Sequence, residues 1–566
     1  MRYSVLADTY EELEGTAKKL AKADIISKLL KKTPSEDIPE VVMLLSGRIF
    51  PPWVEREIGV AENLLMRAIA KATGNSEKEI VDKFKKTGDL GLTVEFFIEK
   101  KKQRTLGEEE LTVRKVFDNF RKIAEQEGSG SQDRKLNLLA ELLASAKAKE
   151  ARYVARTVLE QLRVGVAEGI VRDAVAKAFD LNPEDVENAW NFLPDYGQIA
   201  AIAKGKGTKG LQKIELQIGT PCNVLLAEKV PDLKTALESF DKPLLQYKYD
   251  GMRALIHKKG EKIWLFTRRL EDVTKAFPEV VEYARKSLKA REIIVDGEAI
   301  GLDRKTGKPI PFQRLSTRIK RKYDVEKAAN EIPVQVNLFD ILYLNGKTLF
   351  DKNQKERWEL LKKEVKEIKG KFRLTDSLET KDYREAEKFY KESLAAGHEG
   401  LIVKNLDSLY IPGRSVAGGW LKVKPTLENL DLVVVGGVWG TGKRAGWIGS
   451  LILGVRNPDT GKFLECGMMG TGIKEKTAKP EDVTLADMTK MLKPLIIEEK
   501  SHHIKIKPRV VIEVAYEEIQ KSPTYESGYA LRFPRFLRLR EDKGPEEADT
   551  LERMKKIYDM QKGRAK

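Results

Sequence analysis

One lysine in this sequence stands where it could act as a nucleophile on a phosphate. Lys248 begins the hexapeptide KYDGMR, which ends with Arg253. An ordinary lysine has a pKa near ~10.4 and is protonated at neutral pH, but burial and neighbouring cations lower that pKa and release the amine. The same residues also fit a solvated hairpin, because Asp250-Gly251 is a typical tight-turn pair. Whether these residues form a nucleotide site or a hairpin depends on whether the rest of the chain supplies further residues of a nucleotide site.

The elements around Lys248 are predicted to be short strands with charged ends. Residues 244–247 form an apolar run that predicts a buried strand leading into the lysine. Further strands are predicted at 263–267 (followed by Arg268), 293–295 (with the DGE of 296–298 at its mouth), 334–344 (a strand pair), 399–404 and 420–425. Strict alternation along the last of these would put Lys422 and Lys424 on one face. Any one of these could be an ordinary strand with charged residues at its end. Together, however, several strand ends carry Lys, Arg or Glu, which favours a shared site.

Different patterns flank this middle region. Residues 1–210 carry apolar residues at helical spacing, for example over 10–30, 62–73 and 136–146, and predict an all-helical domain. Within it, residues 162–168 separate two helical runs, and the turn at Gly165 either exposes N–H groups to a phosphate or is an ordinary corner between helices. Residues 204–210, KGKGTKG, predict a linker.

The last part of the chain alternates short strand-like runs with glycine turns. The runs lie at 431–438, 448–455, 463–468 and 510–516, and this spacing predicts a small closed β-barrel. Residues 545–562 predict a final helix.

Length, charge and cysteine content limit the possible functions. The chain has 566 residues, which predicts about three or four domains, and a formal net charge of +16, which favours a polyanionic partner such as nucleic acid. Its two cysteines, Cys222 and Cys466, exclude a disulfide framework and a Cys-rich zinc site. No apolar run approaches the length of a membrane span, and the N-terminus is unlike a signal peptide. We therefore expect an intracellular protein of the cytoplasm or nucleoid, without a membrane partner.

The ordered motifs of the chain resemble those of the covalent nucleotidyltransferases. They are KYDGMR at 248–253, DGE at 296–298, LFDILY at 338–343, EGLIVK at 399–404, WLKVK at 420–424, and ALRFPR through REDK at 530–543. Within that superfamily the chain resembles the ATP-dependent DNA ligases of the archaeal and eukaryotic replicative type over nearly its whole length. The resemblance implies a multidomain fold: an all-α DNA-binding domain at 1–210, an α+β adenylation domain at 211–426, and an OB-fold β-barrel domain with a C-terminal helix at 427–566.

The resemblance also implies roles for individual residues. Lys248 would attack the α-phosphate of ATP and carry AMP as a phosphoramidate. Phe339 would stack on the adenine, and Gln246, where family members often have Glu, would contact its edge. Glu298 would hold the ribose hydroxyls. The cations that would contact ribose or phosphate are Arg253, Arg268, Arg414, Lys422 and Lys424, and Arg532, Arg535 and Lys543 with Asp542 would approach the ATP tail. Glu399, with Glu298, would hold Mg²⁺, for which Mn²⁺ is a possible substitute.

The implied function is the sealing of 5′-phosphate/3′-hydroxyl nicks in duplex DNA during replication, repair and recombination, by a monomer that uses ATP. Replicative ligases often carry a sliding-clamp peptide, a Gln with an aliphatic residue three positions on and aromatic residues six and seven positions on. Gln103 and Leu106 begin that pattern, but Glu109 and Glu110 follow, and charges cannot fill an apolar pocket. We expect weak or no clamp binding through this segment.

Three other functions remain to be weighed. An RNA ligase or a capping-type nucleotidyltransferase would share the Lys248 motif, but neither is expected to carry some 200 helical residues before it. An NAD-dependent ligase would bring a Cys₄ zinc module, which two cysteines cannot form. A non-catalytic DNA-binding protein with a dead core would have lost its nucleophile, and Lys248 is present.

Overall fold

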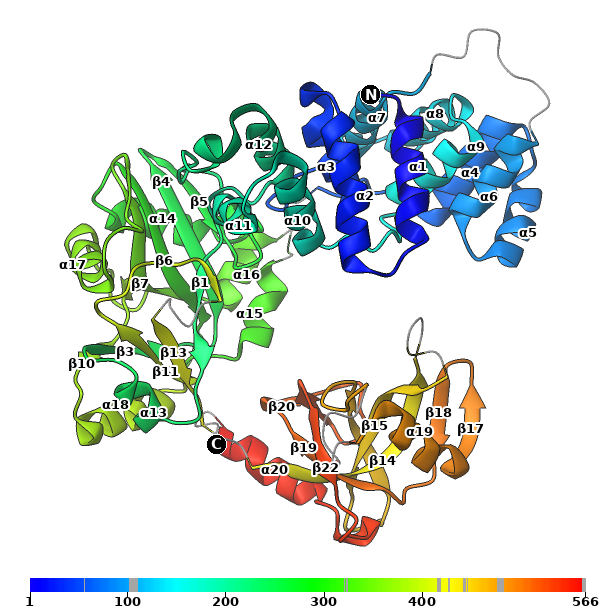
Figure 1. Ribbon diagram of the computed structural model, residues 1–566. Helices are drawn as coiled ribbons and strands as arrows, with labels where there is room; N and C mark the ends of the chain where they lie inside the picture. The colour runs from blue at the N-terminus through cyan, green and yellow to red at the C-terminus, as the bar shows by residue number, and fades with distance from the viewer. Residues whose placement is uncertain are drawn as a thin grey trace. The chain divides into compact units, whose positions relative to one another are not determined.

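The computed structural model describes the chain except for residues 55, 101–109, 320, 322–323, 415–418, 426–427, 441–443, 445, 476–482 and 562–566 (Figure 1). By packing, the chain divides into two compact units. The first comprises Met1–Glu228, Gly251–Thr375 and Lys404–Trp420, and the second comprises Lys229–Asp250, Asp376–Val403 and Leu421–Lys566. Each unit is described by itself.

The first unit begins with a bundle of helices, as the apolar spacing predicts. They are α1 (Tyr3–Glu14), α2 (Lys19–Lys32), α3 (Ile38–Leu45), α4 (Glu62–Thr73), α5 (Glu77–Thr87), α6 (Leu90–Glu99), α7 (Val113–Ala124), α8 (Ser131–Ala144), α9 (Ala148–Val158), α10 (Glu168–Phe179), α11 (Pro183–Phe192) and α12 (Tyr196–Leu211). One hydrophobic core runs through them, from Tyr3 to Leu211. Among the sequence predictions, α4 has the predicted bounds.

Two predictions in this region are wrong. The run 10–30 is interrupted, because α1 ends at Glu14 and α2 begins only at Lys19, with Gly15 between them. Residues 204–210 are helical and not a linker, since they lie inside α12, where Gly207 alone leaves the helical conformation at φ 56° and ψ −153°. A run rich in Gly and Lys suggests a linker, yet here Gly210 and Leu211 are buried against the bundle.

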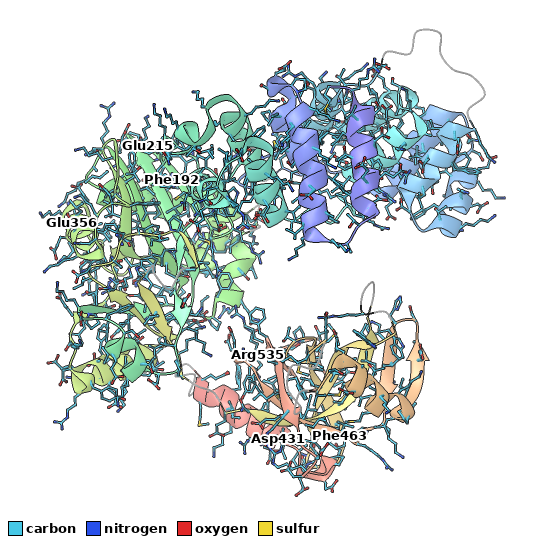
Figure 2. The ribbon with its side chains drawn as sticks, in the orientation of Figure 1. Phe192, Glu215, Glu356, Asp431, Phe463 and Arg535 are labelled. Atoms are coloured by element: carbon cyan, nitrogen blue, oxygen red, sulfur yellow. The ribbon has the colours of Figure 1, made fainter. Side chains whose placement is uncertain are left out.

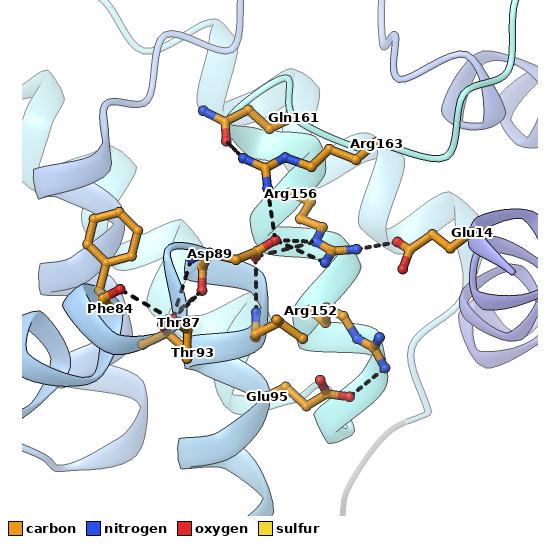
Figure 3. A network of polar contacts seen from close by, with 11 residues as sticks. Glu14, Phe84, Thr87, Asp89, Thr93, Glu95, Arg152, Arg156, Gln161 and Arg163 are labelled. Atoms are coloured by element: carbon orange, nitrogen blue, oxygen red, sulfur yellow. Dashed lines mark hydrogen bonds and ion pairs between the residues drawn. The ribbon is translucent and has the colours of Figure 1, made fainter. Parts of the chain in front are cut away.

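A buried group of charges ties α1, α6 and α9 together (Figure 3). Asp89 caps α6 by accepting from the Leu92 N–H at 3.1 Å, and it accepts from Arg156 of α9 at 3.0 Å. Arg156 also pairs with Glu14 of α1, and Arg163 in the turn after α9 lies 3.4 Å from Asp89. Burial alone would raise the pKa of Asp89, but the hydrogen bonds and charge of Arg156 outweigh burial and hold that pKa below its ordinary value.

The first unit also contains a sheet in the order β5-β4-β6-β7-β8, with β9 beside β7. Its strands are β4 (Met252–Lys259), β5 (Lys262–Phe266), β6 (Glu292–Gly301), β7 (Val334–Leu344), β8 (Lys347–Thr348) and β9 (Phe372–Leu374), with α14 (Pro278–Ser287), α15 (Phe312–Ile319), α16 (Val325–Glu331) and α17 (Gln354–Glu364) beside them in the chain. A short parallel pair joins β1 (Leu225–Leu226) to β12 (Gly413–Arg414).

Two further predictions are corrected in this sheet. Residues 334–344 are one strand and not a strand pair. Asp296, Gly297 and Glu298 lie inside β6 and not at its mouth, because β6 pairs along this stretch with β4 and β7 at once. Gly297 allows the close approach of β7, since a Cβ there would lie 2.9 Å from the Asn337 carbonyl oxygen.

The second unit contains a five-stranded sheet, and the predicted nucleophile Lys248 is the last residue of one of its strands. Its order is β10-β3-β11-β13-β2, with β2 (Glu228–Lys229), β3 (Pro243–Lys248), β10 (Ser377–Glu379), β11 (Gly400–Asn405) and β13 (Trp420–Val423). Leu245, Val403 and Leu421 belong to a core that includes residues of α13 (Leu233–Glu238) and α18 (Tyr383–Ala395). By strand alternation, Gln246 and Lys248 share the other face of β3. Since β3 and β4 belong to different sheets, residues 248–253 are not a hairpin.

The rest of the second unit is rich in strands, as predicted. They are β14 (Leu430–Trp439), β15 (Ile448–Arg456), β16 (Phe463–Met469), β17 (Ile496–Lys500), β18 (His503–Ile506), β19 (Val511–Ala515), β20 (Glu518–Lys521), β21 (Tyr529–Arg532) and β22 (Arg535–Leu539). Strand β14 pairs with β15, β18 and β19, and β19 pairs with β22. The predicted final helix is shorter than expected, with a 3₁₀ turn at Pro545–Glu547 before α20 (Leu551–Met560). Among the described residues, no helix has the length and apolar character needed to cross a membrane.

Candidate active site

Two ammonium groups, at the ends of β3 and β13, contact one carboxylate. Lys248 donates a hydrogen bond to Glu399 Oε2, and Lys424 Nζ lies 2.8 Å from the same oxygen. The Glu399 N–H also donates to the Lys248 carbonyl at 2.8 Å, which fixes the two residues side by side. The side chains are 21%, 11% and 27% exposed for Lys248, Glu399 and Lys424, so the group is partly screened from water but still accessible. A carboxylate hydrogen-bonded to a lysine is placed to accept its proton.

A glycine next to Glu399 makes this arrangement possible. Gly400 opens β11 with φ +137°, a conformation that L side chains rarely adopt. A Cβ at this position would lie 2.1 Å from the Val423 carbonyl oxygen of β13. The close contact of two backbones therefore determines where Glu399 stands.

Gln246 is buried without the partners that a buried amide normally has. Its side chain is 1% exposed, and neither Oε1 nor Nε2 has a hydrogen-bond partner among the residues that the structure describes. An unsatisfied buried polar group costs about 1–3 kcal/mol. Because Gln246 shares a strand face with Lys248, the two side chains are two residues apart on one surface.

In the first unit, Arg253 and Asp296 form a buried ion pair beside aromatic rings. The guanidinium donates to both carboxylate oxygens, Nε at 2.7 Å and Nη2 at 2.5 Å. Its central carbon lies 4.9 Å from the ring centroid of Phe339, which is half-buried. Burial alone would lower the pKa of Arg253, but the charge of Asp296 outweighs it and raises that pKa, so Arg253 is a permanent cation here.

Lys404 lies against the same rings, although its motif predicts no role for it. It is 1% exposed, donates to the Phe339 carbonyl at 2.9 Å, and places its ammonium 3.8 Å from the Trp420 ring centroid. Burial lowers the pKa of Lys404 to about 7. The one available signal was a lysine after the apolar residues 401–403, since a charged residue that closes such a strand requires buried partners.

The remaining predicted residues of the first unit are distributed over different elements. Glu298 is half-buried in β6, where its backbone pairs with Arg253 and Asn337. Arg268 lines a cavity of about 670 Å³, together with Arg48 and Trp190 of the helical region. The backbone of Arg414 pairs with Leu226, and its side chain lies outside the described part of the chain.

The cations of the last motif are paired within the strand-rich region. Lys543 and Arg540 both contact Asp431 Oδ2, at 2.7 and 2.6 Å (Asp431 is labelled in Figure 2). Asp542 pairs with Arg540 at 2.8 Å, and Arg532 lies 3.3 Å from Glu518.

Arg535 and Lys422, two further predicted site residues, lie in strands of the second unit. Arg535 begins β22 and pairs through its backbone with Ala515. Lys422 lies in β13, on the face opposite Leu421 and Val423.

The donor groups fit a metal ion bound only in part by protein. In the described ranges, no group of three or more His, Cys, Asp or Glu side chains could hold a metal ion. Mg²⁺ commonly binds through one or two carboxylates and takes its other ligands from substrate phosphates and water. Within the second unit Glu399 is a carboxylate of that kind, and here it contacts two lysines. The predicted clamp residues Gln103, Leu106 and Glu109 lie outside the described residues.

Comparison with known proteins assigns most of the chain to one family. Family models match three successive segments: "DNA ligase N terminus" at residues 2–176, "ATP dependent DNA ligase domain" at 224–424 and "ATP dependent DNA ligase C terminal region" at 444–543. The architecture is thus an N-terminal helical domain, a central adenylation domain and a C-terminal strand-rich domain.

Whole-chain relatives agree with this assignment. The DNA ligase of Nanoarchaeum equitans is 47% identical over 100% of this chain and 99% of its own length. The DNA ligase of Thermococcus onnurineus is 46% identical over 99% of this chain and 98% of its own length. A solved structure named "Pmar-Lig_PreS3" shares the fold, with a TM-score of 0.53, 17% identity, and coverage of 94% of this chain and 99% of that one. The chain belongs to the ATP-dependent DNA ligases.

Proposed function

We propose that this DNA ligase seals nicks by forming an adenylate on Lys248. The Lys248 amine attacks the α-phosphorus of ATP, a P–N bond forms, and the bond to the β-phosphate breaks to release pyrophosphate. The nick's 5′-phosphate oxygen then attacks the same phosphorus and releases the lysine amine. Finally the 3′-hydroxyl attacks the 5′-phosphate, forms the phosphodiester and releases AMP. The RNA-directed and non-catalytic alternatives are disfavoured by the whole-chain likeness to DNA ligases.

The contact between Lys248 and Glu399 carries this proposal. Attack requires the neutral amine, and Glu399 accepts a hydrogen bond from this amine. Lys424 shares the carboxylate and supplies a second positive charge where phosphate oxygens would lie. Lys422, Arg253, Arg268 and Arg414 are proposed as the further phosphate and ribose contacts, with Phe339 stacked on the base and Glu298 on the ribose.

A divalent cation would complete the phosphate site. Mg²⁺, or Mn²⁺ in its place, would neutralise the phosphate oxygens during transfer, and we assign Glu399 and Glu298 as its protein ligands. Both lysine contacts of Glu399 use Oε2, so its two carboxylate oxygens would be shared between these lysines and the metal ion.

Label transfer from ATP tests the nucleophile. The full chain is incubated with ATP labelled at the α-phosphate and with Mg²⁺, and the protein is separated on a denaturing gel. Lys248→Ala should carry no label, and Lys248→Arg should be equally inactive because guanidinium stays protonated. Lys259→Ala, a change at a lysine whose side chain is 62% exposed, is the matched control and should be labelled normally. An acid-labile adduct on the alanine variant would show that another residue is the nucleophile.

The strand-rich region is proposed to be an OB-fold that serves the first step. Its antiparallel order, with β14 pairing on both sides and β19 leading to β22, supports an OB-fold. Boundaries at 1–210, 211–426 and 427–566 are proposed for the three domains. In this proposal Arg532, Arg535 and Lys543 stabilise the departing pyrophosphate. Asp542→Ala with Lys543→Ala should then slow enzyme adenylylation severely, while pre-adenylated nicked DNA is still sealed without ATP. Equal loss in both reactions would contradict this division of labour.

The chain is proposed to act as a monomer that binds the sliding clamp weakly or not at all. The motif at Gln103 lacks the aromatic residues that fill an apolar pocket. Clamp binding at micromolar affinity or tighter that disappears in Gln103→Ala would overturn this. We also propose an intracellular location, consistent with a DNA substrate.

A further inference from the structure

We propose that Asp431 is a positioning residue for the first step of ligation, because it holds the ammonium of Lys543 in place for the departing pyrophosphate. The inference rests on the proposed function, in which Lys543 stabilises that pyrophosphate. It deepens that function by assigning a role in adenylylation to a buried carboxylate that lies outside the ordered motifs of the chain.

The backbone around Asp431 is held on two sides. Asp431 lies in β14 and pairs there with Glu513 of β19. Its N–H donates to Asp549 Oδ2 at 2.8 Å, and the Asp549 N–H donates to the Asp431 carbonyl at 2.8 Å. Asp431 is also only 7% exposed. A short side chain on this frame keeps its negative charge in one place.

One oxygen of the Asp431 carboxylate accepts from two cations of the last motif. Lys543 Nζ donates to Oδ2 at 2.7 Å, and Arg540 Nη1 donates to the same oxygen at 2.6 Å. The other oxygen, Oδ1, is buried and has no hydrogen-bond partner among the described residues. Within the described part of the chain, the hydrogen bonds of this carboxylate therefore go to these two cations.

The two cations differ in how much of their donor capacity the protein uses. Arg540 donates Nη1 to Asp431, and it donates Nε and Nη2 to Asp542 at 2.9 and 2.8 Å, with its side chain 14% exposed. The side chain of Lys543 is 31% exposed, and its contact with Asp431 takes one of the three N–H donors of an ammonium. Arg540 is thus part of the frame, whereas Lys543 can keep its contact with Asp431 and also donate to a phosphate oxygen.

Lys543 needs a partner of this kind to act as a fixed charge. It lies in a turn, where its N–H donates to the Arg540 carbonyl at 3.1 Å, and its charge sits on a flexible four-carbon stem. A cation stabilises a transition state best when it is in place beforehand, because no reorganisation is then needed. A contact that helps only the charge developed during transfer should affect kcat and leave KM for ATP nearly unchanged.

The experiment separates the first step from sealing in the full chain. Adenylylation is measured as label transfer with Mg²⁺ from ATP labelled at the α-phosphate, over a range of ATP concentrations. Sealing is measured with pre-adenylated nicked duplex DNA and no ATP. Asp431→Asn keeps the shape and removes the charge. It should lower the adenylylation rate at saturating ATP by about tenfold, less than the loss of a direct transition-state donor, and leave KM and sealing within about twofold of wild type.

Two further variants test whether Asp431 acts through Lys543. Glu513→Gln is the matched control, because Glu513 faces Asp431 across the β14–β19 pair and forms its own ion pair, with Arg538 at 2.6 Å. It should change neither rate. Lys543→Ala should slow adenylylation, and adding Asp431→Asn to it should slow that step no further, because residues that act as one unit are not additive.

These measurements distinguish this inference from the proposed function. If Lys543→Ala is labelled as fast as wild type, the proposed role of Lys543 itself is wrong. If Lys543→Ala is slow but Asp431→Asn is not, only the role of Asp431 is overturned. Equal slowing of both steps by Asp431→Asn, or further slowing in the double variant, would assign Asp431 to the fold alone.

Faster labelling of Asp431→Asn would also overturn the inference, because it would show that Asp431 competes with pyrophosphate for Lys543. Should Asp431→Asn fail to fold, Asp431→Glu replaces it. This change keeps the charge but moves it by one methylene, so the same loss in adenylylation without loss in sealing is expected.

Discussion

Two buried polar groups in this molecule, the Asp89 carboxylate and the Gln246 amide, differ in whether the protein supplies their hydrogen-bond partners. In the helical region the Asp89 carboxylate, 9% exposed, accepts from Arg156 and from the Leu92 N–H, and Arg156 in turn contacts Glu14. In the five-stranded sheet Gln246 is buried more deeply, at 1% exposed, yet neither polar atom of its amide has a partner among the described residues. The first group is satisfied by the protein itself and stabilises the fold. The second stays costly until something else pairs with it, which is what a binding site requires.

The largest effect should follow from breaking the satisfied group. Asp89→Ala leaves Arg156 buried with only part of its pairing, and breaking a buried pair on one side costs about 3–5 kcal/mol. Denaturant unfolding of the full chain measures this loss. Asp133→Ala is the control, because the Asp133 side chain is 80% exposed and 4.0 Å from Arg67, and it should leave stability nearly unchanged. Equal stability of the two variants would mean that the buried network contributes nothing.

An effect of intermediate size is expected at Lys404, whose contribution to the free energy of unfolding should change with pH. In the unfolded chain its pKa returns to about 10.4, whereas burial holds it at about 7 in the fold. Between these values the unfolded chain binds a proton that the folded chain does not, so the free energy of unfolding rises with pH. Relative to Lys404→Met, wild type should gain up to about 1.4 kcal/mol per pH unit from pH 7 to 9. Parallel stability curves for the two proteins would show that Lys404 keeps its charge in the fold.

Removing the unsatisfied Gln246 amide should raise the free energy of unfolding, whereas removing the Asp89 carboxylate lowers it. Gln246→Met replaces an unpaired buried amide with an apolar side chain of similar length, so unfolding should cost about 1 kcal/mol more than in wild type. At the same time labelling by ATP should fall, because the base contact is gone. A variant that is less stable than wild type would show that the Gln246 amide is satisfied in the folded protein.

The smallest effect on stability is expected at Lys543. Its side chain is 31% exposed, and Arg540 still contacts Asp431 when Lys543 is removed. Lys543→Ala should therefore change the free energy of unfolding by less than about 1 kcal/mol. Thermal unfolding of wild type and variant at matched pH tests this, and a loss of several kcal/mol would place Lys543 with Asp89 as a structural residue.

The same comparison explains what could be predicted from sequence. Helix α4 is amphipathic and ends at Gly74 in the left-handed conformation, so local pattern was enough to define Glu62–Thr73. The strand β3 and the lysine at its end follow equally from a local apolar run. The glycines of residues 204–210 and 296–298 suggested breaks. At 296–298, pairing with β4 and β7 on both sides continues the strand. At 204–210 the chain does kink at Gly207, but the residues on both sides of the kink are helical.

Long-range partners are what the sequence could not supply. Nothing local links Asp89 to Arg156, or Lys404 to the rings of Phe339 and Trp420, because these contacts depend on how separate elements pack. The motif identified Lys248 and Glu399 as members of one site, but not that Lys424 shares the same carboxylate oxygen. Site membership follows from residue type and order, whereas protonation and pairing follow from the fold.

Gly400 sets a practical limit on engineering this enzyme. Because its absent side chain would meet the Val423 carbonyl at 2.1 Å, no other residue fits without parting two adjacent strands. Directed evolution of the active site should therefore leave position 400 constant and diversify the side chains around it. In a library that randomises both Glu399 and Gly400, most variants would carry a side chain at position 400 and could not form the contact between β11 and β13.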